Sequence, residues 1–195
     1  NTTNSAVMEQ TANALLAIGA SPVMARAIEE VEEMTKIANS LVLNIGTLSN
    51  NWIQAMMLSL KVANSKEIPV IFDPVGSGAT SYRTKTAKEI LEHGSLSVIR
   101  GNVSEILSLP ENQCTTKGVD SVLHASLYRE QAKTLALKYK CTVWMSGQAD
   151  VISDGNCSFL VHNGDRLMNL VTGMGCTATA ITGAFLSVNK NPFLG

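Results

Sequence analysis

The chain has 195 residues, of which 45% are hydrophobic and 16% are charged, and its formal net charge is −1. This profile is typical of a folded domain, and we expect residues 1–195 to form a single one. It excludes the strongly basic surface of a nucleic-acid-binding protein and the long apolar run of a membrane helix. The four cysteines have no paired spacing, so we expect a cytoplasmic protein without a zinc site or a disulfide scaffold.

Helical and strand patterns alternate along the chain. Apolar residues at helical spacing indicate helices, and short apolar runs that end at polar residues or glycines indicate strands. In chain order, the patterns predict helices over 4–18 and 26–39, a strand over 41–45, a helix over 51–65, a strand over 69–72, a helix over 84–93, a strand over 96–99, helices over 103–109 and 125–140, strands over 141–145, 150–153 and 158–162, and a last helix from near Cys176. This alternation predicts βαβ units and a parallel sheet with helices on both faces.

Polar residues and glycines follow four of the predicted strands. They are Gly46 and Thr47, Asp73, Arg100, and Ser146. The carboxyl ends of parallel strands meet at one edge of a sheet, and ligands bind there in open α/β sheets. An acid, an arginine and small hydroxyls are therefore expected to lie together, which favours a catalytic site at this edge.

Residues 171–176 (VTGMGC) place two glycines before a cysteine that opens an apolar run with helical spacing. Backbone N–H groups at such a turn, and at the helix start behind it, carry partial positive charge and bind anions such as phosphate. A thiol in the same field loses its proton more readily, so Cys176 is a candidate base or nucleophile. The alternative is a turn that caps a core helix, with Cys176 as a small buried hydrophobe.

Three charged residues at this edge also have structural interpretations. Asp73 precedes a proline and can simply start a turn, although the glycines at 76 and 78 favour backbone that approaches a ligand. Asn102 and Glu105 have the spacing of a capping box, which is compatible with metal binding by Glu105. Arg100 can pair with a surface carboxylate, but its planar fork also suits the oxygens of a phosphate.

Several motifs together resemble the hydroxyethylthiazole kinase family, whose members are ribokinase-like enzymes of thiamine salvage. In family order they are TAN at 11–13 with LLAIGASPVM at 15–24, LNIGTL at 43–48, DPVGSGAT at 73–80, IRGNVSE at 99–105, KGVDS at 117–121 and VTGMGC at 171–176. None is specific alone, but together they extend from near the first residue to near the last. The resemblance implies a ribokinase-like three-layer α/β/α sandwich with a mostly parallel central sheet.

The chain also departs from the family pattern. Members normally have a further strand region before residue 1 and several helices after residue 195, so we expect a fragment that lacks both terminal segments. Where the family commonly has Thr-Gly-Glu-x-Asp, this chain has SGQAD at 146–150. Ser146 keeps the hydroxyl, whereas Gln148 replaces a carboxylate on the nucleotide side of the site.

The resemblance implies that ATP donates its γ-phosphoryl group to the primary alcohol of 5-(2-hydroxyethyl)-4-methylthiazole, and that Mg²⁺ assists. It also implies a role for each candidate residue. Cys176 takes the place of the aspartate base of other ribokinase-like enzymes and accepts or orients the hydroxyl proton, and the anion hole is formed by Gly173, Met174, Gly175 and Cys176. Mg²⁺ is held by Asp73 and Glu105, partly through water, and the ATP phosphates are contacted by Arg100 and Ser146. The thiazole pocket is lined by Asn4, Met24, Gly46, Thr47 and Gly173.

In the family the thiazole pocket lies between neighbouring subunits, so the implied assembly is a homotrimer. Three other functions stay open. A kinase of another small alcohol, such as a hydroxymethylpyrimidine, is disfavoured by Met24 and by a cysteine at position 176. An ADP-forming repair enzyme acting on hydrated nicotinamide nucleotides would prefer an aspartate there. A non-catalytic binding or assembly module would bind the thiazole without turnover.

Overall fold

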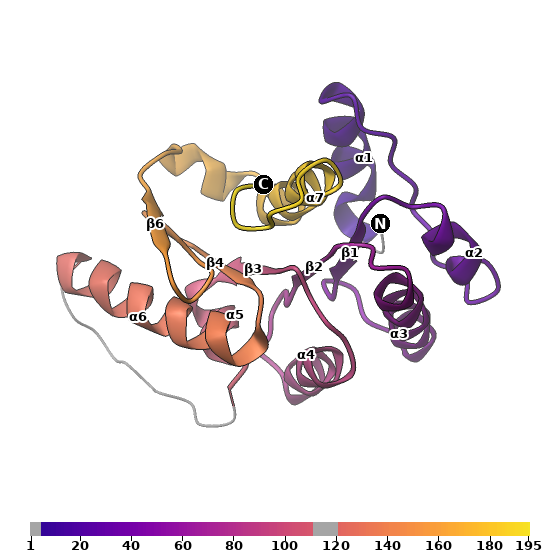
Figure 1. Ribbon diagram of the computed structural model, residues 1–195. Helices are drawn as coiled ribbons and strands as arrows, with labels where there is room; N and C mark the ends of the chain where they lie inside the picture. Colours follow the sequence, from indigo (N-terminus) through magenta and orange to yellow (C-terminus); the bar gives the residue numbers. More distant parts are fainter. Residues whose placement is uncertain (1–4, 111–120) are drawn as a thin grey trace.

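A six-stranded sheet forms the middle layer of the structure, a computed structural model that describes residues 5–110 and 121–195 (Figure 1). The strands lie side by side in sequence order: β1 (Leu41–Asn44), β2 (Val70–Asp73), β3 (Val98–Asn102), β4 (Thr142–Ser146), β5 (Asp150–Ser153) and β6 (Ser158–Val161). The first four are parallel, and β5 and β6 join them through antiparallel pairs. The prediction of a mostly parallel sheet is confirmed.

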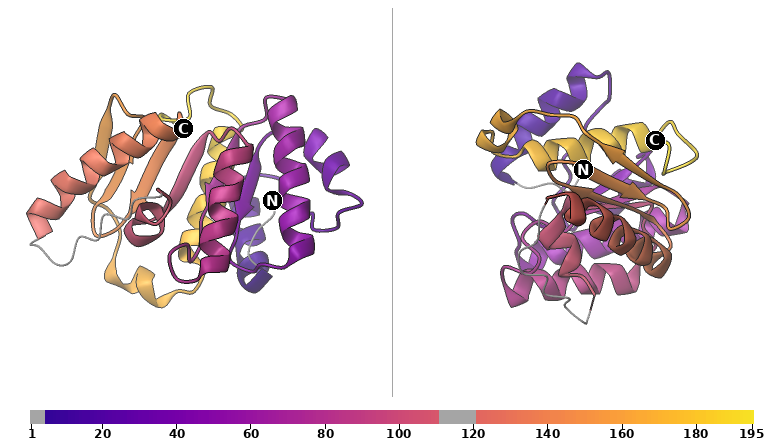
Figure 2. Two further views of the ribbon diagram at one scale, coloured as in Figure 1. Left: turned by 90° about the horizontal axis from the view of Figure 1, so that it is seen from below. Right: turned by 90° about the vertical axis from the view of Figure 1, so that its left-hand side faces the viewer.

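Helices cover both faces of this sheet (Figures 1 and 2). On one face α7 (Met174–Leu186) lies against β1 and β2 and packs with α1 (Met8–Ala17). The other face carries α3 (Asn50–Ser65), α4 (Ser81–His93), α5 (Val103–Leu107) and α6 (Ser121–Tyr139), and α2 (Val31–Lys36) packs on α3. Two 3₁₀ turns, η1 (Ser5–Val7) and η2 (Arg166–Leu170), precede α1 and α7. The layers are those of an α/β/α sandwich.

Strand residues point alternately to the two helical layers. Leu43 belongs to the larger core cluster beneath α3, whereas Val42 and Ile71 pack with Leu186 of α7 in a smaller cluster. Strands buried on both faces need apolar residues at successive positions, which explains the continuous apolar runs in the sequence. A Cβ atom on Gly183 would lie 2.6 Å from Val42 Cγ2, so this glycine lets α7 approach β1 closely.

The segment before β1 differs from its prediction. The pattern predicts a helix over 26–39, but α2 is confined to Val31–Lys36. Residues 21–27 have no regular structure, and the turn that follows begins where the Val31 N–H donates to Ala27 O. The guanidinium of Arg26 lies 4.5 Å from the ring centroid of Trp52 in α3. Residues 21–27 therefore form no helical turn, and Ala25 and Arg26 instead pack against α3.

Two strands extend beyond their apolar runs, and this places two candidate residues inside the sheet. Asp73 is the last residue of β2, and Arg100 lies within β3. Both side chains are nearly buried, with exposed fractions of 2% and 8%.

In the part of the chain that the structure describes, no helix has the length and apolar character that a membrane span requires.

Candidate active site

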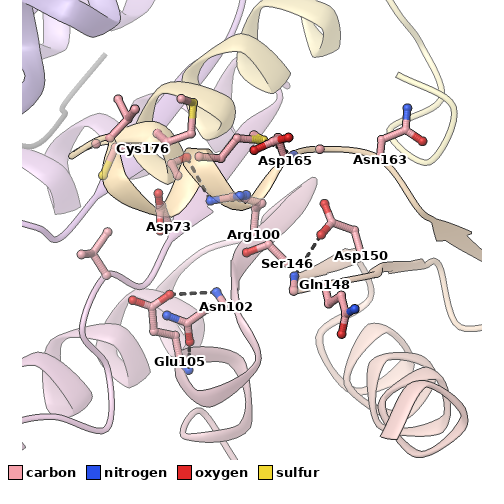
Figure 3. A pocket seen from close by; sticks show the side chains of 18 of the residues that line it. Asp73, Arg100, Asn102, Glu105, Ser146, Gln148, Asp150, Asn163, Asp165 and Cys176 are labelled. Carbon is pink, nitrogen blue, oxygen red and sulfur yellow. Dashed lines mark hydrogen bonds between the residues drawn. The ribbon is translucent and has the colours of Figure 1, made fainter. Parts of the chain in front are cut away.

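A cavity of about 1060 Å³ opens at the carboxyl ends of β2, β3 and β4, beside the N-terminus of α7 (Figure 3). Eight predicted site residues line it: Asp73, Arg100, Glu105, Ser146, Gly173, Met174, Gly175 and Cys176. Met24, Gly46 and Thr47 are not among the lining residues, and Asn4 lies outside the described residues. The cavity therefore brings together the residues predicted to bind phosphate and metal, but of the described residues predicted to line the thiazole pocket it contains only Gly173.

The glycine turn leads directly into α7, as the sequence predicts. Gly173 is the N-terminal cap and has a φ of +80°, a left-handed conformation that favours glycine. The first N–H groups of a helix have no intrahelical acceptor and carry the positive end of the helix dipole. Cys176, the third residue of α7, is 8% exposed and forms part of the cavity wall. This arrangement can bind an anion and place a thiol beside it.

Asp73 is held by two hydrogen bonds to the same carboxylate oxygen. Asn44 Nδ2 donates to Asp73 Oδ2 at 2.9 Å, and Thr179 Oγ1 of α7 donates to it at 2.8 Å. Burial raises the pKa of Asp73 to about 7, and the charge of Glu105 adds to this rise, while Arg100 and the two hydrogen bonds oppose it. No donor in residues 5–110 and 121–195 bonds to Oδ1, which leaves this oxygen for a ligand.

Replacing Asp73 by asparagine is expected to change how the stability of the metal-free protein depends on pH. The pKa of Asp73 is about 7 in the fold, and about 4 in an unfolded chain. The folded protein thus binds this proton more tightly, and the resulting stability is complete below about pH 4 and lost as the pH rises through about 7. Denaturant unfolding in EDTA should show Asp73→Asn gaining up to about 4 kcal/mol over the parent towards pH 8. A pH-independent difference would contradict the expectation.

Glu105 has both of its oxygens bonded to backbone. Asn102 Oδ1 accepts from the Glu105 N–H and Glu105 Oε2 accepts from the Asn102 N–H, both at 2.9 Å, so the predicted capping box is confirmed. Glu105 Oε1 accepts from the Gly76 N–H at 2.8 Å, which ties α5 to the loop after β2. The carboxylate nevertheless lines the cavity together with Asp73 (Figure 3).

The donor set at this position fits Mg²⁺ better than a metal that needs an all-protein cage. Mg²⁺ commonly takes one or two carboxylates and completes its shell with water and substrate phosphates. Asp73 Oδ1 has no donor among the described residues, and each oxygen of Glu105 accepts one hydrogen bond and keeps a second lone pair. Within the described ranges there is no cluster of three or more His, Cys, Asp or Glu side chains suited to a metal.

Arg100 points from β3 towards the start of α7. Its Nη1 donates to Gly175 O at 2.9 Å, and its guanidinium lies 5.2 Å from the ring centroid of Trp144. The Nε atom is buried and has no hydrogen-bond partner in the described part of the chain. No ion pair forms between Arg100 and a surface carboxylate of the described residues, so that interpretation is wrong for them. An unpaired donor on a cation facing an anion cradle suits a phosphate oxygen.

Asp150 organises the turn that contains the serine. One of its oxygens accepts from Gly147 N and the other from Trp144 Nε1, each at 2.9 Å. Ser146 Oγ donates to Gly101 O at 3.3 Å and lines the cavity, as does Gln148. The Ser146 hydroxyl therefore lies where a nucleotide phosphate can reach it, and Gln148 presents an amide instead of the family's carboxylate.

Met24, Gly46 and Thr47 belong to two segments, one between α1 and α2 and one after β1, that contribute no lining residue to this cavity. Gly46 follows β1, and its N–H donates to Asn44 Oδ1, the side chain that also holds Asp73. Met24 is half-buried in the irregular segment between α1 and α2. Among the predicted thiazole contacts that the structure describes, only Gly173 lines this cavity.

Sequence reasoning missed several residues of the site. The cavity is also lined by Asn163 and Asp165, which lie between β6 and η2, and by Arg166, the first residue of η2, and no pattern predicts η2. Asn44 and Thr179 were missed as partners of Asp73. Asn44 does carry a signal, because an amide within an apolar strand needs a partner once it is buried.

Comparisons with known proteins point to one family. Residues 1–195 match the hydroxyethylthiazole kinase family. A hydroxyethylthiazole kinase from Desulfotalea psychrophila is 51% identical over 191 residues, which are 98% of this chain and 70% of that protein. The solved structure of a hydroxyethylthiazole kinase protein from Pyrococcus horikoshii OT3 has a TM-score of 0.87 and 42% identity, and the match covers 97% of this chain and 70% of that one.

A more distant structure shows the fold class alone. A ribokinase-like superfamily protein from Enterococcus faecalis V583 has a TM-score of 0.60 at 17% identity, over 88% of this chain and 57% of that one. The ribokinase-like α/β/α fold is thereby confirmed. With the match over residues 1–195 and about half of the residues identical to curated relatives, the chain belongs to the hydroxyethylthiazole kinase family.

Proposed function

We propose that this kinase transfers the γ-phosphoryl group of ATP to the hydroxyl of 5-(2-hydroxyethyl)-4-methylthiazole in thiamine salvage. The observation that carries the proposal is that a glycine turn at a helix N-terminus, the buried Arg100 and the carboxylates of Asp73 and Glu105 line one cavity. Phosphoryl transfer depends mainly on positioning and on neutralising charge, and this cavity offers groups for both. The identity of about half with hydroxyethylthiazole kinases supports the thiazole alcohol as acceptor.

Each group at the cavity has a proposed role in this reaction. The backbone N–H groups of residues 173–176 stabilise the charge of the transferring phosphoryl group. Arg100 and Ser146 bind the phosphates of ATP, and Cys176 accepts or orients the proton of the acceptor hydroxyl. Asp73 and Glu105 hold Mg²⁺, partly through water, and the bound ion would neutralise charge on the phosphates.

Removing either carboxylate is expected to weaken the use of Mg²⁺. Asp73 Oδ1 accepts no hydrogen bond from the described residues and Glu105 lines the same cavity, so Asp73→Asn and Glu105→Gln should each raise the Mg²⁺ concentration that gives half-maximal activity. The measurement is a Mg²⁺ titration of ATP-dependent activity. An unchanged half-saturation in the Glu105→Gln protein would leave this residue only its capping role.

The acceptor pocket and the assembly are proposed together. Asn4, Met24, Gly46, Thr47 and Gly173 are proposed to contact the thiazole, but Met24, Gly46 and Thr47 do not line the cavity that contains Gly173. A homotrimer with sites between subunits would bring residues from two chains together at one pocket. Closed rotational symmetry is the common form of such assemblies, and it places the same pair of surfaces at every interface.

A substrate panel tests the function. The protein is assayed for ADP formation from ATP, and for the modified acceptor, with the thiazole alcohol, with hydroxymethylpyrimidine and with hydrated nicotinamide nucleotides. We expect turnover with the thiazole alcohol well above turnover with the others. Preference for another substrate would assign the corresponding alternative function. Thiazole binding without turnover would identify a non-catalytic module and end the proposal.

A further inference from the structure

Arg83 of α4 joins the two loops that follow β1 and β2. Its Nη1 donates to Val75 O at 2.7 Å and to Ile45 O at 3.1 Å, and its Nη2 donates to Gly46 O at 2.8 Å. Figure 1 shows α4 on the face opposite α7. Among the described residues no acidic side chain forms an ion pair with this guanidinium. The charge of Arg83 therefore acts entirely on backbone carbonyls at the edge of the sheet that carries the site.

One of these hydrogen bonds leads directly to Glu105. Val75 C=O and Gly76 N–H belong to the same peptide group, so a guanidinium bonds its oxygen and the Glu105 carboxylate bonds its N–H. A peptide dipole between a cation and an anion is polarised by both, which strengthens the two hydrogen bonds. Arg83 thus fixes the orientation of the peptide that fixes Glu105 Oε1.

The close approach of Arg83 depends on the glycine in this peptide. Gly76 has a φ of +73°, and a Cβ atom there would lie 2.9 Å from Arg83 Cδ and 3.0 Å from Nη1. The sequence pattern favours a ligand beside Gly76 and Gly78, but the space at Gly76 is filled by Arg83 and that at Gly78 by Ser108. The absence of a side chain at each glycine leaves room for another side chain of the protein, and at position 76 that side chain is Arg83.

We propose that Arg83 is a positioning residue that fixes residues 45–47, the acceptor loop, relative to the carboxylate of Glu105. The inference rests on the proposed function, in which Gly46 and Thr47 contact the thiazole alcohol and Glu105 holds Mg²⁺. The two amino groups of one planar guanidinium reach the acceptor loop and the Val75–Gly76 peptide at once. Arg83 thereby sets the distance between the acceptor hydroxyl and the phosphate that the metal orients, without touching either.

The test compares Arg83→Met and Arg83→Lys with Lys85→Met, a matched loss of charge at an exposed position on the same helix. Removing a side chain that orients a metal ligand commonly costs about 10- to 100-fold. We expect Arg83→Met to raise both the Mg²⁺ half-saturation and the KM for the thiazole alcohol by about that factor. Arg83→Lys, which keeps the charge but not the fork, should show a smaller rise in both, and Lys85→Met should match the parent.

The coupling of Arg83 to Glu105 through the Val75–Gly76 peptide is called the relay here. A double-mutant cycle separates the relay from a general loss of stability. Once Glu105→Gln has removed the carboxylate, Arg83→Met should add little to the Mg²⁺ half-saturation, because the two residues act through one peptide. Fully additive effects would overturn the proposal. So would a folded Arg83→Lys protein whose melting temperature falls while both kinetic constants stay at parental values, since that result describes a purely structural residue.

A binding measurement keeps this inference apart from the proposed function. If the parent protein does not phosphorylate the thiazole alcohol, the proposed function fails, but the relay to Glu105 can still be measured. Calorimetric titration with Mg²⁺ and ADP should then show weaker binding to Arg83→Met than to Lys85→Met. Equal affinities of these two variants would overturn the relay whatever the substrate is.

Discussion

Replacing Cys176 by alanine is expected to lower kcat on the order of 10²- to 10⁴-fold, the usual contribution of a positioned proton acceptor. Cys176 lies in the first turn of α7, lines the cavity and follows the turn that is proposed to hold the transferring phosphoryl group. The acceptor hydroxyl must approach that group closely to react, so its proton would lie next to the thiol. Affinity for ATP should change little, because the backbone N–H groups and Arg100 remain.

Two further variants make the Cys176 result decisive. Cys141 is also 8% exposed, and burial raises the pKa of its thiol to about 12, so Cys141→Ala controls for the loss of a buried cysteine far from the cavity. Its kcat should equal that of the parent. Cys176→Asp should keep substantial activity, since a carboxylate can accept the same proton. A Cys176→Ala protein with parental kcat would mean that this residue only packs against its neighbours.

The layered fold was predictable because it depends on local patterns. Continuous apolar runs such as residues 41–43 form strands that are buried on both faces, and the helical segments between them lead each strand back in parallel. Ligands bind where parallel strands end, and this rule predicts that Asp73, Arg100 and Ser146 lie together; one cavity contains them, whereas Gly46 and Thr47, selected by the same rule, do not line it. The prediction of a helix over 26–39 was wrong at its start, because Arg26 contacts Trp52 of α3 and the helical pattern in the sequence is only local.

The residues that support the site were less predictable, because their partners lie far away in the sequence. Thr179 bonds to a carboxylate 106 residues before it, and Arg83 bonds to a carbonyl 38 residues before it. No local spacing reports such pairs. The raised pKa of Asp73 is equally a product of folding, since it follows mainly from burial at the end of β2 beneath α7.

The position of Met24 leads to the prediction on assembly. Met24 does not line the cavity that contains Cys176, whereas both are proposed to act on the same substrate. If the pocket is shared, a Cys176→Ala protein and a Met24→Arg protein, each inactive alone, should regain activity when their subunits exchange. In a trimer mixed in equal amounts, about a quarter of the interfaces combine the intact Met24 surface of one chain with the intact Cys176 surface of its neighbour. The expected recovery is thus about a quarter of parental activity per site.

A second mixture supplies the matched control. Asp73 and Cys176 line one cavity of one chain, so mixing Asp73→Asn with Cys176→Ala leaves every site with one of the two defects. That mixture should stay inactive, while the mixture with Met24→Arg recovers. Activity should also fall on dilution below the concentration at which subunits separate, because a shared site exists only in the assembly. If subunits exchange, as mass spectrometry of mixed trimers can show, and the Met24→Arg mixture stays inactive, each chain builds its own pocket. Met24 must then reach the substrate by a movement of the segment between α1 and α2 within a single chain.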